Sequence, residues 1–553
     1  MRNLKCLAFA LAFGAIPLAA APGVSNPKEV VDRIMAQERL EMQSFRRYSP
    51  LVETYIQYVR PDKQFGDVPD GDKYFLGRAD LANGLEIESL DRGAGIKQRF
   101  IGGLGKFFST EFVPGGFLQM IYLDRDNFDR AHYNLEYVGR EFLGEVRCFV
   151  FDVSPLPNAG KGRFVGRVWV EDENFHIVRF NGRYGGASLT NNYLNFDSWR
   201  VNVGKNIWVP AFVYSEGPRM HDPKTRSLGF KAFRAQTRLW GYDLGHVGEQ
   251  QELSKVLVEG PTQLPDLSQP GDDYSPFQAL RTWDRMAEMN VTDQLQRQGL
   301  LAPPGDVDKV LNTVVNNLEV TNNLDIQPEV RCRVLMTSTL EAFTVGHTIV
   351  LSRGLIDVLP DEASLAVVLA HELGHVVLRH RMDNQFAFFG QLRFNEKETF
   401  HHFDFSRSEE EELAADKKAV ELLKNSPYNS KLPAAEDFLQ ELMSHSKEIP
   451  NLVSPHLGDS VANRTIGSAM LNDLPPDAKA AANDFSALPL GGRIKVNPWN
   501  DRLTLLKVQS IGALAEDEKR PLQVTPIALY LTRHDESAAP GSATAILAPG
   551  TQP

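Results

Sequence analysis

The chain of 553 residues is too long for a single hydrophobic core and predicts about three domains. Its hydrophobic content of 42% and charged content of 24% are typical of globular proteins and exclude a disordered or collagen-like chain. A formal net charge of -12 argues against binding to nucleic acid, because contacts with phosphates need a basic surface.

The N-terminus predicts a secretory signal peptide over residues 1–21. Arg2 and Lys5 precede an apolar stretch from Leu7 to Leu18, which is followed by a run of alanines. A short basic region, a short apolar core and small residues at the end are the features of such a signal. An uncleaved anchor is the alternative, but the stretch is shorter than the ~20 residues that span a bilayer and Pro17 interrupts it. We therefore expect a secreted or periplasmic protein and favour membrane association less.

Residues 27–260 predict a mainly antiparallel β domain that opens with a helix. Residues 27–47 have apolar side chains near helical spacing. Beyond about Thr54, short runs of β-branched and aromatic residues alternate with polar residues and are separated by glycines, as in strands joined by turns. Examples of these runs are residues 149–153, 164–170, 177–180 and 207–214.

The β domain also carries a resemblance. A helix followed by strands that include the sequence GRVWVE at residues 166–171 resembles the carrier fold of the LolA and MucB type. That resemblance implies a curved sheet with a hollow that accommodates lipid. No nucleophile elbow, phosphate loop or cysteine–histidine cluster occurs in this part of the sequence, so a structural or interaction domain is the plainer interpretation.

The remaining segments complete a multidomain α+β chain. Residues 261–306 are rich in proline around a short helical stretch near 277–289 and predict a linker. A mainly helical unit follows at residues 307–510, and the C-terminal extension, 511–553, ends in a tail whose composition predicts disorder. Cys148 and Cys332 fall in different predicted domains, where a disulfide and two buried free thiols are equal alternatives.

One helix of the third unit carries the HExxH motif His-Glu-Leu-Gly-His at positions 371–375. Asp361 is a suitable N-cap for this helix. His371 and His375 are four residues apart, so both imidazoles project from one face and can bind the same metal ion. Glu372 is turned by about 100° from His371 and can reach a water on that ion without binding the metal itself. Zinc lowers the pKa of such a water, and a neighbouring carboxylate takes its proton as it attacks a carbonyl carbon.

A catalytic zinc site needs a third protein ligand. In metzincins it comes from the same segment, but Leu378 and Arg381 occupy the places where that class has Gly and His, which excludes the class. A second predicted helix, residues 408–424, carries Glu412 and Asp416 four residues apart on one face. Glu412 can complete the zinc site, and Asp416 can hydrogen-bond a ligand imidazole from behind. The alternatives are a pair of ordinary core histidines and a solvated acidic helix start.

The segment 367–375, followed by His380, closely resembles the HtpX and CaaX-prenyl-protease family of gluzincin zinc metallopeptidases (the forty-eighth metallopeptidase family), whose periplasmic branch includes BepA-like enzymes. Residues 341–343 and 349–356 resemble the strand before the active-site helix of that family, which usually has Asn in place of Glu341. The Glu-x-x-Ala-Asp sequence at 412–416 resembles its third-ligand motif.

This resemblance implies a zinc endopeptidase with one Zn2+ per chain. It implies that His371, His375 and Glu412 are the ligands and that Glu372 is the general base. It also implies that the strand around Ile349 pairs with the backbone of a protein or peptide substrate. Quality control of envelope proteins, with contact to the membrane or to outer-membrane proteins, is the expected setting, and the oligomeric state stays open.

The same family has a His-Pro pair followed by Arg, whose histidine helps to stabilise the oxyanion formed during hydrolysis. Here a Ser-Pro-His sequence ends at His456 and is followed by Arg464, so the proline precedes the histidine and the arginine lies farther along the chain. An Asn-Pro pair at 497–498 with Arg502 is a second approximate match that lacks the histidine. His456 is therefore the candidate oxyanion partner.

The connection between the two metal helices is rich in phenylalanine and contains His401 and His402. It predicts either a lid or membrane-touching surface, or a loop with its rings packed beneath it. The phenylalanines are Phe386, Phe388, Phe389, Phe394, Phe400, Phe403 and Phe405.

Two alternatives to a peptidase stay open. One is a non-catalytic chaperone that acts through the β domain and has a vestigial or blocked site. The other is a lipid-binding or lipoprotein-binding protein, which follows from the carrier-fold resemblance. The intact set of Glu372, both histidines, Glu412 and Asp416 argues against a dead site, because a dead enzyme has no chemical need for the base.

Overall fold

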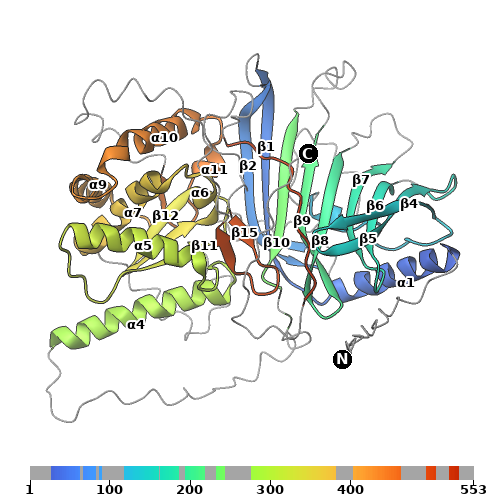
Figure 1. Ribbon diagram of the computed structural model, residues 1–553, viewed down its shortest axis with the longest axis horizontal. Helices are drawn as coiled ribbons and strands as arrows, with labels where there is room; N and C mark the ends of the chain where they lie inside the picture. The colour runs from blue at the N-terminus through green and yellow to red at the C-terminus, as the bar shows by residue number, and fades with distance from the viewer. Residues whose placement is uncertain are drawn as a thin grey trace, which may run out of the picture.

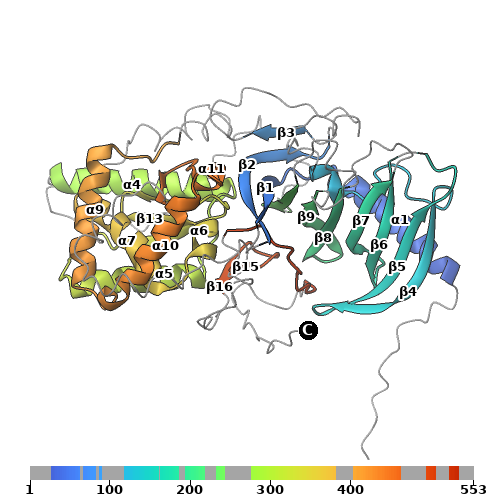
Figure 2. The ribbon, with the colours of Figure 1, turned by 90° about the horizontal axis from the view of Figure 1, so that it is seen from above.

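The computed structural model describes residues 27–62, 66–82, 86–89, 117–160, 162–185, 194–217, 232–242, 244, 276–380, 403–461, 494–505 and 522–534. The predicted signal peptide, Arg381, His401, His402, Arg464, the phenylalanines from 386 to 400 and the tail after residue 534 lie outside the described residues. The described residues form a β lobe (27–244) and a mainly helical lobe (276–461) side by side (Figure 1, Figure 2), and the predicted α+β class is confirmed.

In the described residues the β lobe is one antiparallel sheet of ten strands in the order β3-β2-β1-β10-β9-β8-β7-β6-β5-β4. The chain crosses from β3 to the far edge at β4 and returns strand by strand until β10 pairs with β1. Each run quoted above as a strand lies in one of β5, β6, β7 or β9. The strands are β1 (Leu51–Asp62), β2 (Gly66–Asp80), β3 (Glu86–Ser89), β4 (Tyr133–Leu143), β5 (Val146–Pro155), β6 (Arg163–Glu171), β7 (Ile177–Gly185), β8 (Asn195–Gly204), β9 (Ile207–Glu216) and β10 (Phe233–Trp240).

Helix α1 (Pro27–Phe45) covers one face of the sheet (Figure 2). Ile34 of the helix belongs to the same buried apolar cluster as Val52 and Ile56 of β1. Successive side chains of a strand point to opposite faces, and Tyr55 accordingly belongs to a second cluster that continues into the helical lobe. Strand β1 is therefore buried on both faces, by α1 on one side and by the helical lobe on the other.

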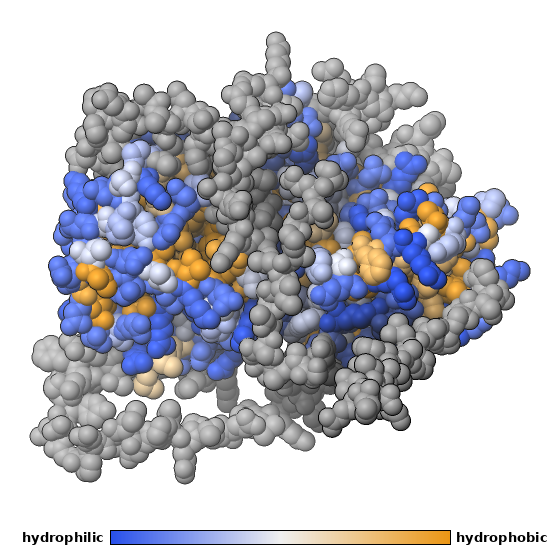
Figure 3. Space-filling model, viewed as in Figure 1, coloured by the Kyte–Doolittle hydropathy of each residue, from blue (hydrophilic) through white to orange (hydrophobic). Residues whose placement is uncertain are grey.

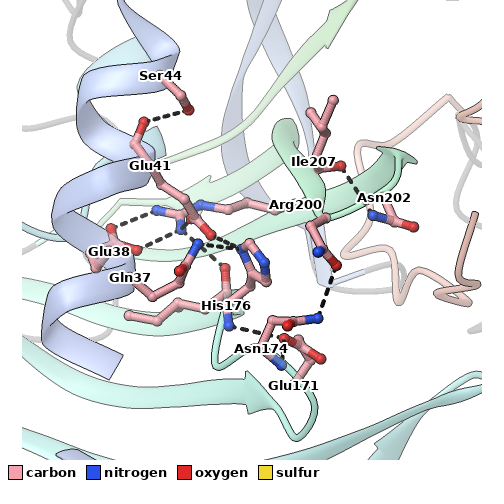
Figure 4. Close-up of polar contacts among 12 residues, drawn as sticks. Gln37, Glu38, Glu41, Ser44, Glu171, Asn174, His176, Arg200, Asn202 and Ile207 are labelled. Atoms are coloured by element: carbon pink, nitrogen blue, oxygen red, sulfur yellow. Dashed lines mark hydrogen bonds and ion pairs between the residues drawn. The ribbon is translucent and has the colours of Figure 1, made fainter. Parts of the chain in front are cut away.

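A buried ionic cluster joins α1 to the sheet (Figure 4). The guanidinium of Arg200 in β8 donates to both carboxylate oxygens of Glu38, over 2.6 and 2.7 Å, and also to Glu41. Glu41 contacts the ring of His176, and burial raises the pKa of the Glu41 carboxyl. Arg200 and Glu38 are fully buried, so the pair is shielded from water and holds the helix in one position on the sheet.

Removal of Arg200 should strongly destabilise the β lobe. In Arg200→Ala the carboxylates of Glu38 and Glu41 stay buried without their cation, so we expect the free energy of unfolding to fall by about 3–5 kcal/mol, measured by urea unfolding with tryptophan fluorescence. Arg33→Ala is the matched control, because Arg33 pairs with Glu29 on the exposed side of the same helix, and it should cost less than about 1 kcal/mol. Equal losses in the two variants would contradict the role given to the buried pair.

The helical lobe contains a four-stranded sheet in the order β11-β13-β12-β14. Strand β13 is interior, parallel to β11 and antiparallel to β12. Strand β14 pairs only with Glu341 and Ala342 of β12, so in the described part of the chain residues 343–345 of β12 have no strand on their outer edge. The strands are β11 (Arg331–Leu335), β12 (Glu341–Val345), β13 (Thr348–Ser352) and β14 (Asp459–Ser460), and a separate hairpin is formed by β15 (Ile494–Val496) and β16 (Leu503–Leu505).

The helices of this lobe pack around its sheet (Figure 1). Helix α4 is longer than the helical stretch predicted inside the linker, and its Ala287, Val291 and Leu295 are buried in the core of the lobe. No described helix is both long and apolar enough to cross a membrane. The helices are α4 (Pro276–Arg297), α5 (Asp306–Thr321), α6 (Arg353–Val358), α7 (Glu362–Val377), α9 (Glu409–Lys424), α10 (Leu432–His445) and α11 (Pro450–Val453).

Residues 522–534, here called the C-terminal strap, run along the β lobe (red in Figure 1). The carbonyl of Leu522 accepts a hydrogen bond from the Gln57 side chain over 2.9 Å, and Arg533 pairs with Glu171 over 2.9 Å. The strap therefore ties part of the predicted C-terminal extension to the first and sixth strands of the sheet.

Both described cysteines are buried free thiols, Cys148 in β5 and Cys332 in β11. Burial raises the pKa of both thiols, that of Cys148 to about 12. The sequence left a disulfide and two buried free thiols as alternatives, and the structure has the free thiols.

Candidate active site

Helix α7 places two histidines in the interior of the helical lobe. Asp361 caps its first turn by accepting a hydrogen bond from the Ser364 N–H over 2.8 Å, as predicted. His371 and His375 lie one turn apart, are almost completely buried, and have their Nε2 atoms 3.1 Å from each other. The two rings therefore point at a common position beside the helix.

Helix α9 approaches α7 closely enough to add a carboxylate at that position. A Cβ atom on Gly374 of α7 would lie 2.9 Å from the carbonyl oxygen of Ala415 in α9, so the contact depends on the missing side chain. The carboxylate of Glu412 consequently lies 3.3 Å from Nε2 of His371 and 3.2 Å from Nε2 of His375. The structure thus brings together the three residues that the sequence predicts as ligands.

The three donors fit a single zinc ion. Tetrahedral coordination with bonds of roughly 2.0–2.1 Å separates neighbouring donor atoms by about 3.3 Å. The two Nε2 atoms lie 3.1 Å apart, and each has one oxygen of Glu412 at a similar distance, Oε2 at 3.3 Å from His371 and Oε1 at 3.2 Å from His375. Two imidazoles and one carboxylate are a donor set of catalytic zinc sites, which keep the fourth position open. In the part of the chain that the structure describes, no other group of three such side chains converges in this way.

Each imidazole also contacts a residue on the side away from the metal position. Asp416, one turn after Glu412, has its Oδ1 atom 2.6 Å from Nδ1 of His371, the arrangement predicted from the sequence. Such a carboxylate orients the ring and makes the opposite nitrogen a better ligand.

His380 plays the corresponding part for His375. Arg379 adopts a left-handed conformation with φ of 57°, which reverses the chain after α7, and the two Nδ1 atoms of His380 and His375 lie 2.8 Å apart. With its Nε2 facing the metal position, His375 carries its proton on Nδ1 and donates it to His380. Burial lowers the pKa of His380, and His375 lowers it further, which favours the neutral acceptor. In the sequence, His380 is part of the segment that resembles the family, and no role for it was predicted.

Replacing His380 should weaken zinc binding without unfolding the lobe. In His380→Ala the proton on Nδ1 of His375 loses its acceptor, and we expect about 10- to 100-fold lower zinc affinity, measured by competition with a chelator. His132→Ala, which removes a histidine from the β lobe, is the control. Wild-type affinity in His380→Ala would show that the contact does not support the ligand.

Glu372 lies between the two histidines and is held by strand β12. Its side chain is only 1% exposed, and the hydroxyl of Thr344 donates to its Oε2 over 2.7 Å. Sequence reasoning missed Thr344, because no local pattern connects a strand residue with a helix residue 28 positions later. The hydroxyl fixes the direction in which the carboxylate points.

We expect Thr344→Val to slow hydrolysis while zinc is retained. A hydrogen bond to a charged group contributes roughly 1.5–3 kcal/mol. If this energy stabilises the transition state, loss of the hydrogen bond lowers kcat by about 10- to 100-fold. Steady-state kinetics and elemental analysis measure the two quantities, and Thr344→Ser, which keeps the hydroxyl, should stay close to wild type. Loss of zinc together with activity would show that Thr344 supports the fold and not the carboxylate.

The strand with an open edge beside this site is β12. The carbonyl of Thr344 points away from β13, because it accepts a hydrogen bond from the guanidinium of Arg407 over 3.1 Å. Strand β13 is paired on both sides. The expectation that the strand around Ile349 pairs with substrate is therefore wrong, since its edges are already used within the sheet.

Glu341 anchors the loop that carries His456. Its buried carboxylate accepts hydrogen bonds from the backbone N–H groups of His456, Leu457 and Gly458 over 3.0, 2.9 and 3.2 Å. Three converging N–H groups form a site for an anion, which accounts for a glutamate where the family usually has Asn. The structure thus holds His456 against the start of β12.

The ring of His456 lies against Tyr74 of the β lobe, with ring centroids 4.6 Å apart. Its backbone N–H is bonded to Glu341, which lies three residues before Thr344 in β12, and His456 is not among the three metal donors. Its action on an oxyanion stays a prediction. The second approximate match forms a turn of its own, in which the Asn497 N–H donates to the Arg502 carbonyl over 2.7 Å.

Two phenylalanines of the aromatic connection fall within the described residues. Phe405 stacks on Phe343 of β12 with centroids 4.6 Å apart, and Phe403 is also buried. Of the two alternatives for this connection, these two residues fit the loop with its rings packed beneath it and not the lid or membrane-touching surface.

The site coincides with a family match. Residues 305–456 match the model of Peptidase family M48. The match includes α7, α9 and the loop up to His456, and over these residues it confirms the resemblance to that family. It supports a metallopeptidase, in a family that is zinc-dependent.

Other comparisons concern the β lobe. No curated protein matches the chain. Among solved structures, a domain assigned to an outer membrane lipoprotein-sorting protein from Vibrio parahaemolyticus is 10% identical, with 40% of this chain and 94% of that chain covered and a TM-score of 0.21. A DUF1329 family protein from Desulfovibrio piger is 13% identical, with 41% and 97% covered and a TM-score of 0.21. The MucA/MucB complex of Pseudomonas aeruginosa is 10% identical, with 40% and 95% covered and a TM-score of 0.13. The first and third of these titles name a lipoprotein-sorting protein and MucB, the kinds of protein that the sequence of the β domain resembles.

Proposed function

We propose that this chain is a zinc endopeptidase that hydrolyses peptide bonds of protein or peptide substrates. The observation that carries the proposal is the convergence of His371, His375 and Glu412 on one position, with the buried Glu372 next to His371 in the same helix. Bound there, zinc activates water for attack and polarises the substrate carbonyl. A chaperone or a lipid-binding protein has no chemical need for this arrangement, and the peptidase is therefore preferred.

The residues of the chain then divide the work of hydrolysis. Glu372 accepts the proton of the attacking water and passes it to the leaving amine, while the Thr344 hydroxyl keeps its carboxylate in place. The open edge of β12 receives an extended substrate segment once Arg407 releases the Thr344 carbonyl. His456 donates to the negative charge that develops on the substrate oxygen.

We further propose a secreted or periplasmic location and a role in envelope protein quality control. The basic and apolar N-terminal segment supports the location, and the resemblance to BepA-like enzymes supports the role. Among the residues that Figure 3 colours by hydropathy, hydrophilic ones outnumber hydrophobic ones, which form smaller groups among them, as on a surface exposed to water.

The decisive experiment compares wild type with Glu372→Gln. We expect both proteins to bind one zinc ion by elemental analysis, because Glu372 is not a ligand. Casein or a misfolded outer-membrane protein should be cleaved by wild type, and the variant should lose at least about 100-fold in rate, because its amide cannot accept the proton. Carefully purified wild type without zinc would refute the proposal. Equal hydrolysis by both proteins would remove Glu372 as the base.

A further inference from the structure

We propose that Tyr74 of strand β2 is a positioning residue for His456, so that the β lobe forms part of the active site. The inference rests on the proposed function, in which His456 acts on the substrate oxygen. It assigns to the β lobe a task in turnover that is separate from zinc binding.

The loop from α11 to β14 is held by both lobes. On the β-lobe side, Asp72 of β2 accepts hydrogen bonds from the backbone N–H groups of Asn451 and Leu452 over 2.9 and 2.8 Å and from the Asn451 side chain over 2.9 Å. On the other side, Glu341 holds the backbone of residues 456–458. The main chain around His456 is thereby fixed at two points, one in each lobe.

Tyr74 is itself anchored before it meets His456. Its hydroxyl donates to Oε1 of Glu53 over 2.7 Å. Glu53 is buried and also accepts hydrogen bonds from Arg238 over 2.8 Å and from the Ser338 hydroxyl over 2.9 Å. Burial opposes the negative charge of Glu53, yet the ion pair with Arg238 lowers the pKa of its carboxyl. The phenol ring is therefore held by an ionised group that also joins the two lobes.

The anchored ring presents its side to the imidazole. The centroids of Tyr74 and His456 lie 4.6 Å apart with an angle of 39° between the ring planes, a distance at which aromatic rings attract each other. Glu341 and Asp72 make their hydrogen bonds to the main chain of residues 451, 452 and 456–458 and to the Asn451 side chain, so the direction of the imidazole depends on what its ring touches. An imidazole that donates to a substrate oxygen must keep one direction, and Tyr74 restricts its rotation.

The strand pairing explains why these groups act together. Asp72, Tyr74 and Leu76 are alternate residues of β2 and share one face of the sheet, the face that meets the helical lobe. Glu53 and Tyr55 lie on the same face of β1, where Tyr55 donates to Asp72 over 3.0 Å. One side of two neighbouring strands thus supplies every β-lobe contact to the loop described here.

A double-mutant cycle with Tyr74→Leu and His456→Ala tests the proposal in the full-length enzyme, with a quenched peptide as substrate. We expect Tyr74→Leu to lower kcat about tenfold, with KM and zinc affinity within about twofold of wild type. His456→Ala should lower kcat about 100- to 1000-fold. The double variant should be no slower than His456→Ala alone, because Tyr74 acts through His456.

Matched variants separate positioning from folding. Tyr74→Phe keeps the ring and should recover most of the kcat lost in Tyr74→Leu, whereas Tyr137→Leu, on the exposed surface of β4, should match wild type. Tyr74→Met fills much of the same volume and replaces Tyr74→Leu in the cycle if the leucine variant does not fold.

Two results overturn this inference alone: wild-type kcat in a folded Tyr74→Leu or Tyr74→Met variant, or losses that multiply in the double variant. A wild-type enzyme that neither binds zinc nor cleaves the peptide overturns the proposed function, and this inference with it.

Discussion

The close contact between α7 and α9 determines the geometry on which the candidate site depends. Gly374 lies against the backbone at Ala415, and any side chain at position 374 would have to displace that backbone. The contact brings Glu412 and Asp416 to the two sides of the His371 ring, one toward the metal position and one behind it. Since the histidines are buried, the donors are directed before an ion arrives, and electrostatic interactions there are stronger than in water.

The β lobe meets a different constraint, because part of its sheet is covered on both faces. Strand β1 contributes Val52 and Ile56 to the cluster under α1 and Tyr55 to the core shared with the helical lobe. Its buried polar residue Glu53 makes hydrogen bonds across the lobe boundary. A two-sided strand cannot shift its register by one residue without exchanging these two sets of side chains. Because α1 and the helical lobe pack on opposite faces of the same sheet, the sheet fixes the position of each relative to the other.

Local patterns predicted the parts that are local. The cap at Asp361, the strands of the β lobe and the contact of Asp416 with a ligand imidazole follow from spacing and side-chain chemistry. The edge position of β12 did not follow, because strand order depends on long-range pairing that periodicity does not encode. The contact of Thr344 with Glu372 was not predicted for the same reason. Tyr74 was not predicted either, because it lies in a separate predicted domain, more than 380 residues from its partner His456.

The C-terminal strap has a consequence for how the protein is made. Gln57 of β1 bonds to Leu522, 465 residues later in the chain, and so cannot complete its contacts until synthesis has passed Leu522. Contacts of such sequence separation form late and slowly, because a long loop must close first. Until then the Gln57 side chain of the first strand lacks the partner that it has in the folded protein. Attachment of the C-terminal strap to the β lobe is therefore a late step of folding, and a chain that has not yet made this contact is more exposed to misfolding and proteolysis.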